Sequence, residues 1–254
     1  MLKEKLVSYT FILFMFDKLL TMIDGWMCVE DESEFSYEQN VENGPEKWGK
    51  LKPEWKMCGK GEMQSPIDLM NERVRIVSHL GRLTRNYKPC NASLKNRGHD
   101  MMLRFEERPG SIKINGIEYQ LLQLHWHSPS EHTIMEEGIC NILKHMFALE
   151  LHMVHESING SMAVVTVLYK IGRSDSFLTL LENKLSAMTD QNEAEFNIGM
   201  IDPKEIKIGS RKYYRYVGSL TTPPCTQNIT WTVVKKVRTV ARNQVRLLRV
   251  AVHD

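Results

Sequence analysis

The stretch Leu121-Leu122-Gln123-Leu124-His125-Trp126-His127 decides how this sequence folds. Side chains alternate between the two faces of a β-strand, so Gln123, His125 and His127 share one face and the apolar residues between them share the other. The apolar face requires a hydrophobic core, whereas the opposite face is too rich in imidazole for ordinary packing. We therefore expect a strand that lines a core on one side and a polar site on the other.

A second stretch, Phe147–Val154 (FALELHMV), alternates in the same way. It places Glu150 and His152 on one face and mostly leucine and methionine on the other. If the two stretches pair as antiparallel strands, the imidazoles of His125, His127 and His152 converge. Three neutral imidazole nitrogens that leave a fourth coordination position open are typical of a catalytic zinc site. We therefore predict Zn²⁺ as the cofactor, with these three histidines as its ligands.

Polar residues beside these histidines strengthen the prediction. Gln123 and Glu150 each lie two residues before a predicted ligand, where they can hold the free ring N–H groups of the ligands. His132 and His155 are expected to support the site through hydrogen bonds, and His145 is a competing ligand without a matching partner. A single histidine, or one His-x-His pair, is at least as often an ordinary hydrogen-bonded residue. The prediction therefore rests on the three histidines together with their two polar neighbours.

The composition of the chain excludes several classes of protein. Of its 254 residues, 33 are Lys or Arg and 31 are Asp or Glu, so the formal net charge is only +2. Nucleic-acid binders usually present a strongly basic face, so we expect no such partner. A content of 42% hydrophobic and 25% charged residues is that of a globular chain, not a disordered one. No repeat or linker divides the sequence, so we expect one domain over residues 33–254, of unknown oligomeric state.

The spacing of apolar residues predicts a mostly β protein with a few short helices. Asn115-Gly116 lies between two apolar runs and predicts a hairpin. The run MAVVTVLY (162–169) predicts a strand buried on both faces. Further strands are expected over residues 231–240 and 245–252. A helix is expected over residues 176–187, with an apolar side formed by Phe177, Leu180, Leu181 and Leu185.

The N-terminus has the pattern of a secretory signal peptide. Lys3 and Lys5 precede an apolar run from Leu6 to Phe16 that is too short to span a bilayer. We predict a leader over residues 1–28, although no clear cleavage site follows and a hydrophobic N-terminal helix is the alternative. No other segment has the length and apolar character of a membrane span.

Three Asn-x-Ser/Thr sequons, at Asn91, Asn159 and Asn228, agree with secretion. Asn91 and Asn159 adjoin turn-like residues and are the better candidates for glycosylation. Asn228 runs into an apolar strand pattern, which makes it the weaker one.

Several longer motifs resemble the α-class carbonic anhydrases, particularly their plant members. The resemblance extends over most of residues 35–252, and such a series of motifs in the right order is very improbable by chance. It implies a single domain around a large, mostly antiparallel twisted β-sheet with a few short surface helices. The motifs are Asn43-Gly44-Pro45 with Trp48, Gln64-Ser65-Pro66-Ile67-Asp68, Asn96-Arg97-Gly98-His99, Gln123-Leu124-His125-Trp126-His127, Ser130-Glu131-His132-Thr133, Glu150-Leu151-His152-Met153-Val154-His155 and Gly218-Ser219-Leu220-Thr221-Thr222-Pro223-Pro224-Cys225.

The resemblance implies an enzyme, a zinc lyase that reversibly hydrates carbon dioxide to bicarbonate and a proton. In this family zinc lowers the pKa of its bound water to about 7, and carbonic anhydrase is itself the standard example of this effect. Thr221 matches the residue that accepts a hydrogen bond from the zinc-bound hydroxide and donates one to Glu131. His99 matches the proton shuttle, since an imidazole with an ordinary pKa of about 6.5 exchanges protons at neutral pH.

Other positions match the contacts of the substrate. Thr222 corresponds to a further polar contact for carbon dioxide or bicarbonate. Carbon dioxide is small and apolar, so its site needs an apolar wall, and without the resemblance residues of this kind would be interpreted as core. The matching wall residues are Val154, Val164, Leu220 and Trp231.

Cys58 and Cys225 match the one disulfide of the secreted members of the family. Such a bond implies an oxidising compartment, and we expect the secretory pathway, leading either to the extracellular space (the apoplast) or to the plastid stroma by way of the ER. Cys28, Cys90 and Cys140 have no assignable partner.

The sequence departs from the family in two places. The family usually continues past residue 254 into a segment with an Asn-x-Arg-Pro-x-Gln motif that supports one ligand histidine, and we expect its loss to lower stability or activity. Residues 134–146 (IMEEGICNILKHM) are longer and more apolar than the plant segment at this place. A non-catalytic, carbonic-anhydrase-like binding protein therefore remains the alternative function, and a zinc hydrolase is a minor third.

A basic stretch near the C-terminus could indicate an anionic partner. Its cations are interleaved with Val and Leu, which favours the solvated faces of strands instead. The stretch comprises Lys235, Lys236, Arg238, Arg242, Arg246 and Arg249.

Overall fold

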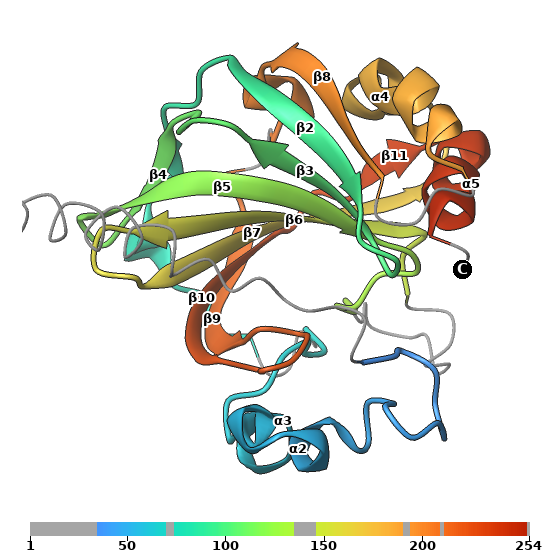
Figure 1. Ribbon diagram of the computed structural model, residues 1–254. Helices are drawn as coiled ribbons and strands as arrows, with labels where there is room; N and C mark the ends of the chain where they lie inside the picture. Colours follow the sequence, from blue (N-terminus) through green and yellow to red (C-terminus); the bar gives the residue numbers. More distant parts are fainter. Residues whose placement is uncertain (1–34, 70–73, 135–145, 190–193, 209–210, 253–254) are drawn as a thin grey trace, which may run out of the picture. The chain divides into compact units, whose positions relative to one another are not determined.

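The computed structural model describes residues 35–69, 74–134, 146–189, 194–208 and 211–252 (Figure 1). The predicted leader over residues 1–28, the competing ligand His145 and most of the unusual segment 134–146 lie outside this part of the chain. Among the described residues, no helix has both the length and the apolar character that crossing a membrane requires.

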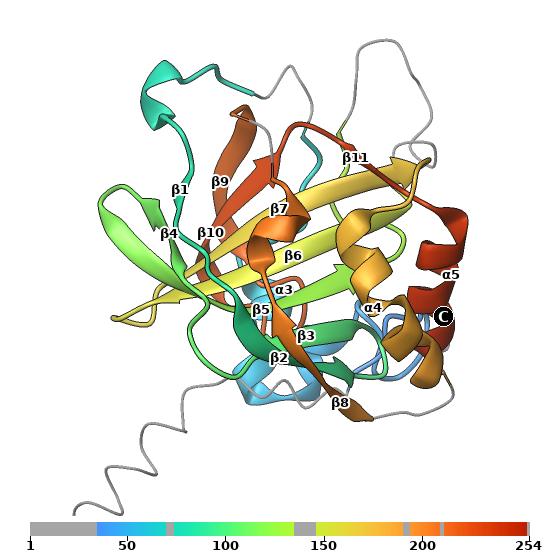
Figure 2. The ribbon, with the colours of Figure 1, turned by 90° about the horizontal axis from the view of Figure 1, so that it is seen from above.

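Eleven strands of the described residues form one sheet, which runs β8-β2-β3-β5-β6-β7-β10-β9, with β1, β4 and β11 paired beside this path (Figures 1 and 2). All pairs are antiparallel except those of β7 with β10 and β11. The prediction of a mainly β, mostly antiparallel domain is confirmed. The strands are β1 (Thr84–Arg85), β2 (Cys90–Asn96), β3 (Met101–Phe105), β4 (Ser111–Ile114), β5 (Ile117–His127), β6 (Leu149–Ser157), β7 (Met162–Ile171), β8 (Glu195–Ile201), β9 (Tyr213–Ser219), β10 (Gln227–Val234) and β11 (Arg238–Val240).

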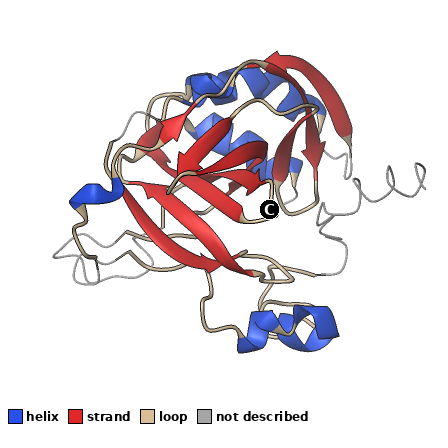
Figure 3. Ribbon diagram, turned by 90° about the vertical axis from the view of Figure 1, so that its left-hand side faces the viewer, coloured by secondary structure: helices blue, strands red, loops and turns tan. Residues whose placement is uncertain are grey.

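Short helices accompany the sheet, and Figure 3 shows how small a share of the fold they form. The α-helices are α2 (Trp48–Leu51), α3 (Met57–Lys60), α4 (Ser176–Ala187) and α5 (Arg242–Ala251), and the 3₁₀ turns are η2 (Pro53–Trp55), η4 (Ser78–Leu80) and η6 (Pro203–Ile206).

Two local sequence signals led to the observed elements. Asn115 and Gly116 both adopt positive φ in the turn between β4 and β5, which the Asn-Gly pair favours. The run over residues 162–169 lies in β7, where every residue from Ala163 to Tyr169 is buried. Both predictions are confirmed, because turn chemistry and an unbroken apolar run are encoded locally.

Helix α4 has the predicted bounds but a slightly different apolar side. Asp175 caps it by accepting hydrogen bonds from the backbone N–H groups of Phe177 and Leu178. Leu180 was expected in the core but is 57% exposed, whereas Leu178 is buried. At 100° per residue the buried stripe runs through residues 177, 178, 181 and 185, which leaves position 180 facing solvent.

The prediction of a strand over residues 245–252 is wrong, because these residues belong mainly to α5. Its buried positions, Gln244, Val245, Leu248 and Ala251, recur at helical spacing. Over so few residues the mixture of Arg with Val and Leu resembled the alternation of a strand. The basic residues of this helix are solvated, as expected, but on a helix instead of on strands. The single strand expected over residues 231–240 is likewise divided into β10 and β11.

The sheet separates a large core from the predicted site. Leu149, Leu151 and Met153 of β6 pack in the main hydrophobic core with α4 and α5, whereas Glu150, His152 and Val154 point to the other face. Pairing of β5 with β6 sets His125 opposite His152 and His127 opposite Glu150. The antiparallel pairing on which the predicted metal site depends is confirmed.

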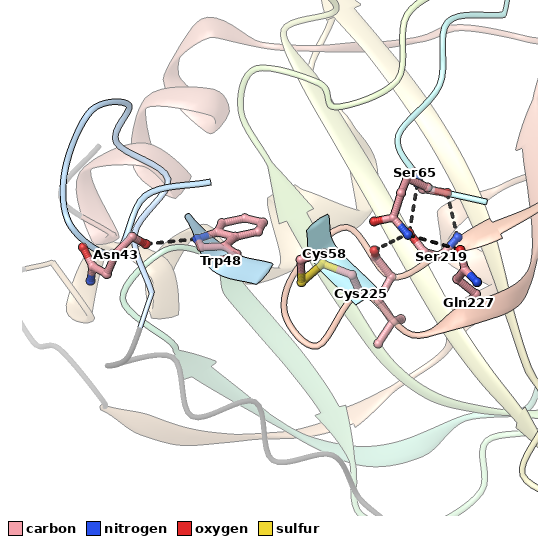
Figure 4. The surroundings of a disulfide bond; sticks show 9 residues. Asn43, Trp48, Cys58, Ser65, Ser219, Cys225 and Gln227 are labelled. Carbon is pink, nitrogen blue, oxygen red and sulfur yellow. Dashed lines mark hydrogen bonds between the residues drawn. A yellow bond between two sulfur atoms is a disulfide. The ribbon is translucent and has the colours of Figure 1, made fainter. Parts of the chain in front are cut away.

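A disulfide ties the N-terminal part of the described chain to the loop after β9 (Figure 4). Cys58 is bonded to Cys225, as the resemblance implies. Close by, the backbone N–H of Ser65 donates to Ser219 Oγ at 2.9 Å, and Trp48 donates its indole N–H to the carbonyl of Asn43. Cys90 is free and buried, and Cys28 and Cys140 lie outside the described residues.

Candidate metal centre

Three imidazole rings meet at the end of the β5–β6 pair. The ring centroids of His125, His127 and His152 lie 4.8–5.0 Å apart. Three ring nitrogens, one from each histidine, all lie within 4.8 Å of one another. Nε2 of His125 is 3.1 Å from Nδ1 of His152. Metal–nitrogen bonds of about 2.0–2.1 Å in a tetrahedral site separate two ligand nitrogens by about 3.3 Å, so the spacing suits a zinc-sized ion.

Hydrogen bonds at the outer nitrogens fix the tautomers of two of these rings. Nδ1 of His125 lies 2.9 Å from Oε1 of Gln123, and Nε2 of His152 lies 2.7 Å from Oε1 of Glu150. An amide oxygen and a carboxylate can only accept, so each of these ring nitrogens carries the proton. When both rings are neutral, the two facing nitrogens therefore both present lone pairs at 3.1 Å. Such a pair repels unless a cation lies between them.

The third ring completes the group. Nε2 of His127 is buried and has no hydrogen-bond partner among the described residues. Burial is the main cause that lowers the pKa of both His127 and His125, so that both rings are neutral at physiological pH. A buried, unpaired nitrogen is rare in proteins. Three imidazole rings that each turn one nitrogen towards a common point fit a metal ion with one open position.

Glu131 and Thr221 form a polar pair beside the histidines. Oε2 of Glu131 is 3.7 Å from Nε2 of His127 and 3.8 Å from Nε2 of His152. Burial raises the pKa of Glu131, while His127 and a hydrogen bond from Thr221 act in the opposite direction. The hydroxyl of Thr221 thus contacts the carboxylate, as the resemblance implies.

A chain of hydrogen bonds extends from His152 into the core. Glu150 accepts from His152, and its carboxylate also contacts Nδ1 of His132 at 2.6 Å. Nε2 of His132 lies 2.6 Å from the hydroxyl of Tyr216, which contacts Ser65 at 3.0 Å. Burial disfavours a charged His132, but Glu150 outweighs it and raises the pKa of that ring. His132 therefore supports the site through hydrogen bonds, as predicted.

An apolar cluster lies next to the ligands. Val154, Val164 and Trp231 pack together with Ile229, and Leu220 lies against them. The indole of Trp231 is 5.0 Å from the ring of His152. The four residues that the resemblance assigned to the substrate wall are thus brought together, and Thr222 is buried in the adjoining loop.

His99 lies beside the N-terminal end of the described chain. It packs against Phe35 and Tyr37, with ring centroids at 5.0 and 5.4 Å. Burial lowers the pKa of His99 to about 4. The expected shuttle role assumed an ordinary pKa, so the structure holds His99 as a weaker base than that role calls for.

Comparison with known proteins decides the family. Residues 43–254 match the model of the eukaryotic-type carbonic anhydrases. The chain belongs to this family. It is 71% identical to alpha carbonic anhydrase 7 of Arabidopsis thaliana over 89% of this chain and 79% of that protein. It is 76% identical to alpha carbonic anhydrase 2 of the same plant over 83% of each. The crystal structure of dioscorin complexed with ascorbate is similar at a TM-score of 0.80 and 47% identity, covering 86% of this chain and 88% of that one.

In this carbonic anhydrase, His155 lies away from the metal centre, contrary to prediction. It is on the core face of β6, where Nε2 contacts the hydroxyl of Tyr87 at 2.7 Å and Nδ1 donates to the carbonyl of Ala163. Three residues separate it from His152, and an odd separation on a strand moves a side chain to the other face. Its hydrogen bonds therefore support the core.

We expect this histidine to make stability depend on pH. Burial lowers the pKa of His155 from 6.5 to about 4. Between pH 6.5 and pH 4, His155 binds a proton in the unfolded chain but not in the folded one. Its contribution to the free energy of unfolding is therefore complete above pH 6.5 and falls as the pH drops towards 4. The free energy of unfolding lost through protonation of His155 is roughly 3 kcal/mol. Urea unfolding of the wild type and of His155→Gln at several pH values measures it. An equally steep decline in the variant would contradict the assignment.

The predicted glycosylation sites all lie on the surface. Asn91, Asn159 and Asn228 are exposed. Asn159 is in the turn between β6 and β7, as expected. Asn91 was expected beside a turn but is the second residue of β2, and Asn228 lies at a bulge of β10 with a φ of 68°.

Several residues of the site escaped sequence reasoning. Tyr216 holds His132, Ile229 completes the apolar cluster, and Phe35 packs on His99. Tyr216 precedes the quoted motif of β9, and its partner His132 is 84 residues away. No local pattern marks such a residue, because its role depends on which distant strand lies beside it.

Proposed function

We propose that this chain catalyses the reversible hydration of carbon dioxide to bicarbonate and a proton, with zinc held by His125, His127 and His152. The observation that carries the proposal is the meeting of three ring nitrogens, one from each histidine, within 4.8 Å of one another, two of which face each other at 3.1 Å. Family membership supports the same reaction. When bound there, zinc supplies a Lewis acid that makes hydroxide available near neutral pH, for which carbonic anhydrase is the standard example.

Thr221 and Glu131 would orient the attacking oxygen. The hydroxyl of Thr221 has one proton, and a hydrogen bond to Glu131 would commit that proton to the carboxylate in its ionised form, which burial disfavours and His127 and Thr221 favour. The oxygen of Thr221 can then only accept a hydrogen bond from the nucleophile. This directs a lone pair of the nucleophile towards the substrate carbon, which is a positioning effect.

The apolar cluster would hold the substrate. Carbon dioxide offers no proton and only weak acceptors, so it binds best where no polar group competes. Val154, Val164, Leu220 and Trp231 supply that surface within reach of His152, and Thr222 would contact the more polar product. The shuttle role of His99 stays a prediction, and burial, which lowers its pKa to about 4, makes it a weak proton acceptor at neutral pH.

Purified protein tests the proposal directly. We expect about one zinc per chain and a hydration rate well above that of the buffer in a stopped-flow assay. Zinc without a rate above buffer would reject catalysis and favour the alternative, a non-catalytic binding protein.

Replacing Thr221 by valine is expected to lower kcat/KM by about a hundredfold or more, the usual loss when one positioned hydrogen-bonding group is removed from an active site. Zinc content should not change, because Thr221 is not among the ligand candidates. The exposed Thr226 in the same loop provides a matched control, since Thr226→Val should keep the wild-type rate. Equal rates for the two variants would rule out the role given to Thr221.

We further propose that the chain enters the secretory pathway. The Cys58–Cys225 disulfide supports an oxidising compartment, and the exposed sequons support glycosylation there, with Asn159 in its turn as the best placed. Extracellular space and plastid stroma both agree with this route. Mass spectrometry of the protein from its native tissue tests it, and unmodified Asn159 together with a retained leader would contradict it.

A further inference from the structure

The hydroxyl of Tyr216 on β9 is connected to the ligand candidate His152 through a series of three hydrogen bonds. The first of them joins this hydroxyl to Nε2 of His132 at 2.6 Å. His132 has no exposed surface, and a buried ring nitrogen requires a partner inside the protein. Tyr216 supplies that partner, so the position of the His132 ring depends on a strand that contributes no ligand candidate.

His132 in turn holds both carboxylate oxygens of Glu150. Its ring Nδ1 lies 2.6 Å from Oε1, and its backbone N–H donates to Oε2 at 2.8 Å. The same Oε1 accepts the ring N–H of His152 at 2.7 Å. A carboxylate that is bonded at both oxygens cannot turn without breaking one of these bonds. The direction of the His152 ring therefore depends on where the His132 ring lies.

The hydroxyl of Tyr216 is itself held by a second group. Ser65 Oγ lies 3.0 Å from it. Ser65 and Ser219 exchange two further bonds, of 2.9 and 3.1 Å, in which the backbone N–H of each donates to the hydroxyl oxygen of the other (Figure 4). Gly218 permits this close approach, because a Cβ there would overlap Ser65 Oγ and lie 2.7 Å from Cε2 of Tyr216. The tyrosine hydroxyl therefore has a fixed position.

These hydrogen bonds can form whether the His132 ring is neutral or charged. When the ring is neutral, Ser65 donates to Tyr216, and Tyr216 donates to Nε2. When the ring is charged, Nε2 donates to Tyr216, and Tyr216 donates to Ser65. A hydroxyl can act in both directions because it has one proton and two lone pairs. Phenylalanine at position 216 would remove the partner of Nε2 in both states.

We propose that Tyr216 is a positioning residue for the metal centre. Its hydroxyl holds His132 against Glu150, and this contact keeps the ring of His152 turned towards the metal. The role rests on the proposed binding of zinc and adds a residue that touches neither the metal nor a ligand. A group that supports a ligand directly contributes about 10–100-fold to metal affinity. Tyr216 acts through two further residues, so its contribution should be smaller.

Tyr216→Phe tests this role, and Tyr87→Phe is its matched control. The hydroxyl of Tyr87 makes the same kind of bond, at 2.7 Å to Nε2 of His155, but within the main core. Both variants lose one buried Tyr–His hydrogen bond, and only the bond of Tyr216 leads to a ligand candidate. The rate at which the zinc-loaded chains release zinc to an excess of chelator is measured. The absorption spectrum of the Co²⁺-substituted proteins reports the geometry of the ligands.

We expect Tyr216→Phe to release zinc about fivefold faster than the wild type and to change the cobalt spectrum. Tyr87→Phe should release zinc within about twofold of the wild-type rate and keep the wild-type spectrum. Equal release rates in the two variants, or an unchanged spectrum in Tyr216→Phe, would overturn the role of Tyr216. Wild-type protein that retains no zinc would overturn the proposed function as well, so the zinc content of the wild type distinguishes the two failures.

Discussion

Replacing His152 by glutamine is expected to abolish stoichiometric zinc and to reduce carbon dioxide hydration to the rate of the buffer. Nδ1 of His152 is one of three nitrogens in the proposed coordination group, 3.1 Å from its neighbour on His125. Loss of a group that merely supports a ligand lowers metal affinity by about 10–100-fold, so loss of a ligand itself should lower it further. Without the metal, water keeps its ordinary pKa and supplies no hydroxide at pH 7.

His155→Gln is the matched control for this experiment. It removes an imidazole from the same strand, three residues away on the opposite face. We expect it to keep full zinc content and activity. Zinc would be measured by elemental analysis after dialysis, and circular dichroism would confirm that both variants fold. Unchanged zinc in His152→Gln, or equal loss in both variants, would show that the ligand set is wrong.

Removing the Cys58–Cys225 disulfide is expected to lower the free energy of unfolding by about 5 kcal/mol. The bond joins residues 167 positions apart. In the loop-closure account, a cross-link over a loop of this length removes about 5 kcal/mol of chain entropy from the unfolded state, although engineered cases often give less. That is a large share of the roughly 5–15 kcal/mol by which domains are usually stable.

Urea unfolding of Cys58→Ser/Cys225→Ser measures this effect. Cys90→Ser is the control, since it removes a buried thiol that takes part in no bond. We also expect lower activity in the double variant, because Cys225 anchors the loop that carries Thr221. A loss of stability below about 1 kcal/mol would contradict the loop-closure argument.

Much of the candidate site could be predicted from the sequence because β-strands encode their two faces locally. Gln123, His125 and His127 lie on one face of β5, and Glu150 and His152 on the matching face of β6. The same period of two placed the apolar residues of both strands in the core. Turn chemistry was as informative, since Asn115-Gly116 set the register of β4 against β5.

The errors arose where a short pattern suited both a strand and a helix, or where the side of the strand to which a side chain points was not considered. Over residues 242–251, Arg mixed with Val and Leu suits a strand or a helix almost equally, and packing against α4 selected the helix. Gln244 strengthens that choice through its hydrogen bonds with Asp175. His155 was assigned to the site by nearness in sequence, although its position in β6 turns it away.

The sequence by itself determined the strands β5, β6 and β7, the face of each ligand candidate and the family motifs, because these depend on neighbours within a few residues. Only the tertiary structure decided that Tyr216 supports His132, that burial lowers the pKa of His99 and that His155 bonds to Tyr87 in the core. Each of these depends on which residues from distant parts of the chain exclude water around a polar group. A linear pattern carries no direct record of those neighbours.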